Sequence, residues 1–276
     1  MPRSRAADLA ALVRLPNVVL AAAGVAVGAI LVLGRVVVPH AVALAMASAA
    51  CLAAAGNVAN DVYDIDIDRV NRPDRPLPAG GVSPSAAIAV GGIAGGGGLL
   101  LAWLIGGDVL TIAAVALPLM LVYSPLLKPR GLLGNLTIAI IAALPLIYGA
   151  AAAGYWPAGV VPWALAALLH LAREVVKDLE DAPGDRLAGR RTVPIVWGER
   201  AAYVVAAATL ILFIPAALAP WFARWYGNRY GILATLTAVG AAALVVQLLH
   251  RRVTGVRASL KSLMVLGLAA LLWDRL

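Results

Sequence analysis

The chain has 276 residues, of which 62% are hydrophobic and only 13% are charged, and its mean hydropathy is +0.91. Soluble domains are about 45–50% apolar, so this composition excludes an ordinary soluble fold and indicates a membrane protein. The net charge of +8 is no sign of nucleic-acid binding, because the cations flank apolar runs. The single cysteine, Cys51, excludes an internal disulfide.

Nine apolar runs are long enough to cross a bilayer as helices. They lie near residues 17–34, 41–60, 84–106, 109–123, 132–153, 158–176, 201–220, 229–249 and 259–273. No soluble segment of domain size interrupts them. The predicted fold is therefore all-α: a polytopic membrane protein in which residues 1–276 form a single domain, with nine transmembrane helices in one bundle around a central apolar cavity.

Lysine and arginine set the expected orientation. Eighteen of the 22 lie in the leading segment or in and beside the loops after the second, fourth, sixth and eighth spans. The positive-inside rule therefore predicts that the amino terminus and these loops are cytoplasmic and that the carboxyl terminus is outside.

Most of the fourteen acidic residues lie in two stretches, each of which follows an apolar run. The first stretch, from Asn60 to Gly80, interleaves aspartates with arginines. Asn60, Asp64 and Asp68 are spaced i, i+4 and i+8, so on one continuous helix they would share a face. Carboxylates gathered in this way repel one another unless a cation lies among them.

The second stretch, from Arg173 to Gly198, repeats the pattern DxxDxxxDR. The matching residues are Asp61, Asp64, Asp68 and Arg69 in the first copy and Asp178, Asp181, Asp185 and Arg186 in the second. Pro183 and Gly184 predict that the second helix ends before Asp185 and leaves it on a loop. Four spans separate the copies, so both are expected at the same membrane face, as in two related four-span halves followed by a ninth helix.

Oxygen-only ligands favour a hard cation, so the sequence predicts bound Mg²⁺. The expected ligands are Asn60, Asp64, Asp68, Asp178, Asp181 and Asp185. Two such clusters, facing each other on loops that cap the bundle, would hold two or more ions and an anion with several oxygens, of which a diphosphate fits best. The plainer alternative is a pair of solvated acidic loops, which is disfavoured because a repeated acidic pattern at membrane depth is costly unless it has a function.

Basic and polar residues at the same predicted depth complete the candidate site. Lys128 is the only lysine before Lys177, and its loop is too short to carry it far from the acidic stretches. The residues expected to contact the substrates are Arg14, Asn17, Asn60, Asp61, Arg72, Arg75, Tyr123, Lys128, Lys177 and Asp178. For Arg14, a role in topology alone is an equal alternative. His170 and Glu174 lie close to the second motif, and the sequence assigns neither a role.

The spans below these polar residues would hold a hydrocarbon tail, so the predicted anion is an isoprenoid diphosphate. Metal and cations would stabilise the leaving diphosphate as the allylic C–O bond breaks, and the apolar wall would shield the carbocation until a second substrate captures it. The residues expected to carry this chemistry are Asp64, Asp68, Asp181, Asp185 and Lys128.

With these motifs, the chain resembles the UbiA superfamily of intramembrane prenyltransferases over nearly its whole length. Those enzymes have nine transmembrane helices, a first motif NxxxDxxxD and a second motif DxxxD. Asn60, Asp64 and Asp68 match the first motif, and Asp181 and Asp185 match the second. The run from Arg72 to Gly80 is also typical of the family, and Tyr123 with Lys128 is similar to its diphosphate-contacting segment. The resemblance implies Mg²⁺-dependent transfer of a prenyl group to a lipophilic acceptor.

The acceptor is less well determined. The wording of the motifs is most similar to the archaeal branch of the family, whose members add a geranylgeranyl group to geranylgeranylglyceryl phosphate in ether-lipid synthesis. An aromatic acceptor such as 4-hydroxybenzoate, another quinone precursor or a tetrapyrrole stays open. A cation transporter would place its carboxylates nearer mid-membrane, and a phosphatidyltransferase would carry a glycine and alanine motif that this chain lacks. Apart from the bilayer, the sequence indicates no macromolecular partner.

Overall fold

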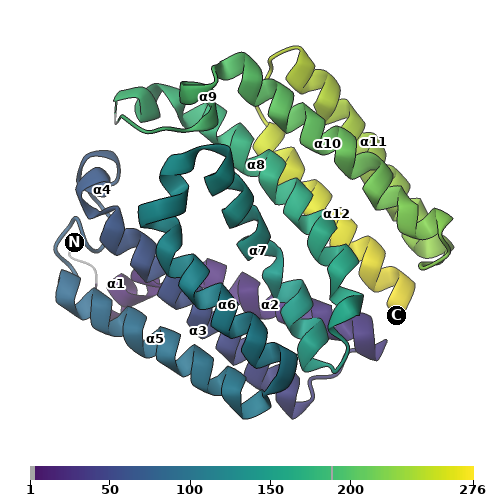
Figure 1. Cartoon of the computed structure of the whole chain (residues 1–276), viewed down its shortest axis with the longest axis horizontal. Coiled ribbons are helices and arrows are strands. Elements are labelled where there is room, and N and C mark those ends of the chain that lie inside the picture. Colours follow the sequence, from purple (N-terminus) through teal and green to yellow (C-terminus); the bar gives the residue numbers. More distant parts are fainter. Residues whose placement is uncertain (1–3, 188) are drawn as a thin grey trace. The chain divides into compact units, whose positions relative to one another are not determined.

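The computed structural model describes residues 4–187 and 189–276, which are almost entirely helical (Figure 1). The α-helices are α1 Arg5–Leu12, α2 Leu15–Leu33, α3 His40–Tyr63, α4 Ile65–Asn71, α5 Pro84–Ile105, α6 Gly107–Val122, α7 Leu132–Ala152, α8 Val160–Leu187, α9 Val193–Val196, α10 Glu199–Phe222, α11 Asn228–Leu249 and α12 Val256–Arg275. A π-helix at Tyr123–Leu127 (η1) and 3₁₀ turns at Lys128–Arg130 (η2) and Trp156–Gly159 (η3) complete the order. The described residues contain no strand, as the all-α prediction requires.

Nine helical segments of the described chain are long and apolar enough to cross a membrane. They are Leu15–Leu33, His40–Tyr63, Pro84–Ile105, Gly107–Arg130, Leu132–Ala152, Trp156–Leu187, Glu199–Phe222, Asn228–Leu249 and Val256–Arg275. All nine predicted spans are therefore confirmed, and the protein is an integral membrane protein. The fourth and sixth segments extend well past their predicted ends, and both extensions carry candidate site residues.

The chain forms two compact units. Unit 1 takes in the residues up to Ala29 together with Val38–Leu126 and Pro145–Pro157, and unit 2 takes in Ile30–Val37, Leu127–Leu144 and Ala158–Leu276. In unit 1, α3 packs on α5 and α6, and α5 also packs on α6 (Figure 1). In unit 2, α8 packs on α10 and α12, and α11 packs on the same two helices.

Small residues set how closely the helices of unit 1 approach. A Cβ atom at Gly98 of α5 would lie 2.9 Å from the Leu52 side chain and 3.2 Å from its backbone nitrogen on α3. A Cβ atom at Gly149 of α7 would overlap the backbone carbonyl of Val25 on α2. Without a hydrophobic force to join helices in lipid, such close backbone packing is a main source of helix association.

The core of unit 2 is built from aliphatic side chains of α8, α10, α11 and α12. Fully buried examples are Val175, Val176, Leu210, Leu248 and Leu260. The amphipathic face of α8 continues this core to its last turns, where Leu179 and Ala182 are buried. The end of α8, which bears the second acidic motif, is therefore fixed by packing.

Two local predictions are wrong, and both concern the acidic motifs. Asn60 and Asp68 do not lie on one continuous helix, because α3 ends at Tyr63 and Asp64 has a bend conformation (φ −91°, ψ 5°). Conversely, α8 does not end before Asp185 but continues through Pro183 to Leu187. Proline removes one N–H bond and crowds the preceding turn, yet α8 continues past it, and Asp185 beyond the proline is still buried.

Candidate active site

The first acidic motif lies at the end of α3 and on α4. The amide of Asp64 donates to the Asn60 carbonyl at 3.0 Å, and the amide of Asp68 donates to the Asp64 carbonyl at 2.8 Å. The i to i−4 bonding therefore crosses the bend, and the side chains stay neighbours although the helix is interrupted. Asp61, Asp64 and Asp68 are buried, with 4%, 8% and 5% exposed surface. Burial of three carboxylates within about two turns requires compensating partners.

Two arginines from outside this motif provide those partners in unit 1. Arg75 Nη1 donates to Asp68 Oδ2 at 2.5 Å and to Asp61 Oδ1 at 3.1 Å. Arg14 donates to Asp61 Oδ1 and, at 2.9 Å, to the side-chain oxygen of Asn60. One carboxylate, that of Asp61, thus lies between two guanidinium groups. This geometry supports a role in the site for Arg14 beyond membrane topology.

The backbone at Arg14 is unusual. Its φ of 55° lies in the left-handed region, between the end of α1 at Leu12 and the start of α2 at Leu15. A non-glycine residue pays for this conformation with strain on the order of 1 kcal/mol, and such residues concentrate at functional sites. The sharp turn directs Arg14 to the motif on α3.

Asn60 organises the polar groups around the motif. Its amide nitrogen donates to Asp64 Oδ2 at 3.1 Å and to the Ser124 hydroxyl at 2.8 Å, while its oxygen accepts from Arg14. Ser124 lies in the π-helix η1, where its neighbour Tyr123 is half-buried. The π-helix, a common feature of functional sites, thus brings the polar segment after the fourth span to the first motif.

The second acidic motif occupies one face of α8. Asp178, Asp181 and Asp185 are spaced i, i+3 and i+7, and Glu174 extends this face by one turn. The Asn135 amide of α7 donates to Asp178 Oδ2 at 2.8 Å. Asp185 is buried, with 6% exposed surface, whereas Asp181 is exposed.

Cations also surround the second motif, within unit 2. Arg190 lies 3.4 Å from Asp185 Oδ1, and its amide donates to the Asp185 carbonyl at 2.9 Å. Lys128 and Lys177 lie close enough to attract the Asp185 carboxylate. Lys177 is also 3.4 Å from Glu174. Lys128 therefore lies close to the second motif, and its contact with a substrate stays a prediction.

The structure also separates predicted residues from those that the sequence missed. Asn17 and Arg72 are exposed, and among the described residues neither side chain forms a hydrogen bond or an ion pair with a motif carboxylate. Ser124, Asn135 and Arg190 contact motif residues and had no assigned role. These three residues lie up to 64 positions in the sequence from the motif residues that they contact. Only their position beside the ends of spans could have marked them as candidates.

In residues 4–187 and 189–276, no three His, Cys, Asp or Glu side chains form a group that could hold a metal ion by themselves. What the geometry provides is two clusters of carboxylates that are held by arginine, lysine and amide groups, each at the end of an apolar helix. Such clusters allow two kinds of chemistry. The carboxylate oxygens can exchange their arginine or lysine partners for a metal ion, and the basic groups can bind a polyanion.

Comparison with known proteins identifies the family of this chain. The model of the UbiA prenyltransferase family matches residues 19–268. The digeranylgeranylglyceryl phosphate synthase of Natronomonas pharaonis is 36% identical over 277 residues, covering 99% of this chain and 98% of the relative.

Solved structures agree in fold. One from work on digeranylgeranylglyceryl phosphate synthase in membranes is 26% identical, has a TM-score of 0.88 and covers 98% of both chains. A UbiA homologue from Archaeoglobus fulgidus bound to GPP and Mg²⁺ is 19% identical, has a TM-score of 0.73 and covers 96% of this chain and 99% of the other. The match to the family model spans most of the sequence, and the chain belongs to the UbiA prenyltransferase family.

Proposed function

We propose that this protein transfers a geranylgeranyl group from geranylgeranyl diphosphate to geranylgeranylglyceryl phosphate. The observation that carries the proposal is the repeated cluster of carboxylates and cations at the ends of α3 and α8, two apolar transmembrane helices. Such a cluster suits a diphosphate that bears a hydrocarbon tail. The choice of acceptor is supported by the named function of the N. pharaonis relative, which aligns over 99% of this chain.

Mg²⁺ is the cofactor that the donor set fits. The candidate ligands offer only oxygen atoms: the carboxylates of Asp64, Asp68, Asp178, Asp181 and Asp185 and the amide of Asn60. Mg²⁺ usually takes only one or two protein carboxylates and completes its shell with water and substrate phosphate. A site that offers fewer than three carboxylate ligands in one group, as in the described chain, fits this coordination of Mg²⁺. When bound, Mg²⁺ would neutralise the diphosphate and stabilise it as a leaving group.

The protein's own cations would bind the diphosphate and orient the carboxylates. Arg75 and Arg14 hold Asp61 and Asp68 in place before substrate arrives. In the proposed complex, Lys128 contacts the diphosphate oxygens as a compact positive charge. Arg72, Lys177 and Tyr123 are proposed to contact the same group, and Asn17 is proposed to lie at the substrate entrance.

In the proposed reaction, the C1–O bond of the donor breaks toward the diphosphate. The hydroxyl oxygen of the acceptor forms the new ether bond to C1, and its proton is lost. The apolar side chains of the transmembrane helices would keep water from the developing carbocation, and this exclusion of water would prevent hydrolysis of the donor. Residues that hold the diphosphate act on the bond that breaks, because they stabilise the charge that develops there.

The proposal requires both acidic clusters to engage one diphosphate at the cytoplasmic face, within a single domain spanning residues 1–276. It also places the amino terminus inside and the carboxyl terminus outside. The even number of spans between the motifs and the bias of lysine and arginine support this arrangement.

A pair of spin labels tests whether the clusters meet. Cys51 is the only cysteine, so Cys51→Ala provides a clean background for Val70→Cys and Leu187→Cys, whose native side chains are 81% and 92% exposed. We expect a label separation below roughly 30 Å. Labels on opposite membrane faces would be separated by at least the hydrocarbon thickness of roughly 30 Å, and such a distance would refute the shared site.

The activity itself is tested with purified protein, geranylgeranyl diphosphate, Mg²⁺ and a panel of acceptors, with products identified by mass. The expected product is digeranylgeranylglyceryl phosphate, formed only when Mg²⁺ is present. Prenylated 4-hydroxybenzoate in its place would assign the enzyme to aromatic acceptors. Product formation at an equal rate in EDTA would contradict the metal assignment.

A further inference from the structure

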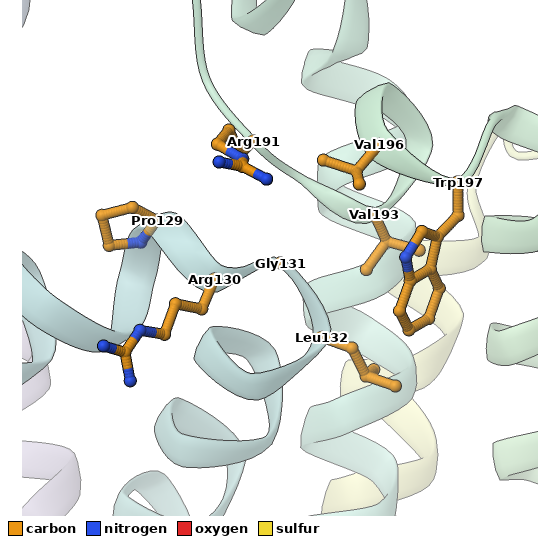
Figure 2. Close-up of a pocket in the computed structure, with 8 residues that line it drawn as sticks. All are labelled: Pro129, Arg130, Gly131, Leu132, Arg191, Val193, Val196 and Trp197. Carbon is orange, nitrogen blue, oxygen red and sulfur yellow. The ribbon is translucent and has the colours of Figure 1, made fainter.

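A cavity of about 340 Å³ lies in unit 2 between two loop segments, Pro129–Leu132 and Arg191–Trp197, the second of which contains the short helix α9 (Figure 2). Its lining residues are Pro129, Arg130, Gly131, Leu132, Arg191, Val193, Val196 and Trp197. Both loops adjoin the second acidic motif: Lys128 directly precedes the first lining segment, and Arg190, which pairs with Asp185, directly precedes Arg191. The cavity is thus next to the proposed diphosphate site but is built from other residues.

The lining is divided into a cationic side and an apolar side. Figure 2 shows Arg130 and Arg191 on one side of Gly131, and Leu132, Val193 and Trp197 on the other. No acidic residue lines the cavity. Within the described ranges 4–187 and 189–276, neither guanidinium group takes part in an ion pair. Two arginines that take part in no ion pair, beside an apolar wall, could bind an anion that carries a hydrocarbon chain once the Arg130 side chain turns toward Arg191.

The two loops approach each other closely at Gly131 and Arg191. Gly131 has a φ of +57°, and a Cβ atom on it would lie 3.2 Å from the Arg191 carbonyl oxygen. Val193 is only 1% exposed and anchors the second loop in the core of unit 2. Helix α7 begins at Leu132 in the cavity wall, so the positive end of its dipole adds to the attraction for an anion.

We propose that this cavity binds the phosphate group of the acceptor lipid, an inference that rests on the proposed function. Arg130 and Arg191 would each present a planar fork of donors to the phosphate oxygens, the geometry in which arginine binds phosphate best. Trp197, which is 56% exposed, would contact the glycerol end of the lipid chain together with Leu132. The donor's diphosphate and the acceptor's phosphate would then have separate sets of cations.

The test compares Arg130→Gln, Arg191→Gln and the double variant with the parent protein in neutral detergent. Arg252→Gln is the matched control, because Arg252 is exposed and lies in the loop before α12. The acceptors are geranylgeranylglyceryl phosphate and its dephosphorylated form, geranylgeranylglycerol. Loss of one charge-assisted contact is expected to raise the KM for the phosphorylated acceptor about tenfold, and loss of both about a hundredfold. The KM for geranylgeranyl diphosphate should not change, and the variants should use geranylgeranylglycerol as the parent does.

Several results would overturn the assignment. They are an unchanged acceptor KM in both single variants, a raised KM for the donor, and an equal loss with geranylgeranylglycerol. An effect that appears only in vesicles with anionic lipid would assign the cavity to a bilayer lipid. If the parent forms no product with geranylgeranylglyceryl phosphate, the proposed function fails and this inference with it. If the parent is active and the variants match it, only the cavity assignment fails. The single variants decide the question even if the double variant does not fold.

Discussion

Arg75→Gln tests whether the first cluster is a site for exchangeable cations. Arg75 is 19% exposed and is the partner of two buried carboxylates, at 2.5 Å from Asp68 and 3.1 Å from Asp61. Asp61 keeps its contact with Arg14 in the variant, whereas Asp68 loses the guanidinium group of Arg75 as its ion-pair partner. Removing one partner of a buried pair costs about 3–5 kcal/mol. Because this guanidinium is partly exposed, we expect about 2–3 kcal/mol.

The assay is thermal unfolding of the purified protein in detergent with EDTA. At about 2–4 °C per kcal/mol for a chain of this size, the melting temperature should fall by about 4–12 °C. Arg69→Gln is the control, because Arg69 forms an exposed pair with Asp66, with 62% and 84% of the two side chains exposed. Exposed pairs contribute about 0–1 kcal/mol, so this variant should unfold close to the parent.

Added Mg²⁺ then separates a structural arginine from one that holds a metal ligand. If Asp68 can exchange its guanidinium for a metal ion, Mg²⁺ should raise the melting temperature of Arg75→Gln more than that of the parent, since ligand binding to the folded state adds stability. Equal melting temperatures of Arg75→Gln and the parent in EDTA would refute the buried-pair argument. An equal response to Mg²⁺ would refute cation exchange at Asp68.

Three other changes have defined outcomes. Asp64→Asn should lower kcat/KM by at least about a thousandfold with little change in melting temperature, because it removes charge while keeping shape; turnover near that of the parent would contradict its role. Gly149→Val should lower the melting temperature and folded yield through overlap with the Val25 carbonyl, whereas Gly96→Val, which meets open space, should not. Asn135→Ala removes the amide that holds the first aspartate of the second motif, and we expect about a tenfold loss of kcat/KM; unchanged kinetics would refute a positioning role.

Most of the fold could be predicted because a bilayer imposes a simple length rule on apolar helices. The errors arose where local and tertiary forces disagree. Pro183 signals a helix end, but α8, which is buried at Leu179 and Ala182 just before it, continues to Leu187. At Asp64, the spacing suggested one straight helix, but the chain bends there while it preserves the backbone bonds to Asn60. The spacing in the sequence therefore identified the motif residues but did not predict their backbone conformation.

The partners of the motif residues were harder to predict than the motifs. Arg75 was expected to bind substrate, and the structure gives it two carboxylate partners. Asn135 lies within an apolar span and has no local pattern that marks it, although its amide contacts Asp178. Such contacts depend on which helices become neighbours, and a single sequence carries little information on that.

The contacts around the motifs strengthen the case for an internal duplication. In the first copy, Arg14 precedes α2 and donates to Asp61, the first aspartate; in the second, Asn135 in the first turn of α7 donates to Asp178. The last aspartate of each copy is bound by an arginine from the loop that follows, Arg75 for Asp68 and Arg190 for Asp185.

These recurring contacts involve residues outside the nine-residue pattern, so chance repetition of that pattern does not explain them. Duplication of a four-span unit explains both, with α2, α3, α5 and α6 as one copy and α7, α8, α10 and α11 as the other. Helix α12 then has no counterpart; it packs on α8 and α11 of the second copy, and its Leu271 also shares a buried cluster with Leu31 of α2. A single helix that follows the second copy and lies outside the repeat is what this history predicts. The two motifs differ at the first aspartate, where two guanidinium groups hold Asp61 and a neutral amide holds Asp178.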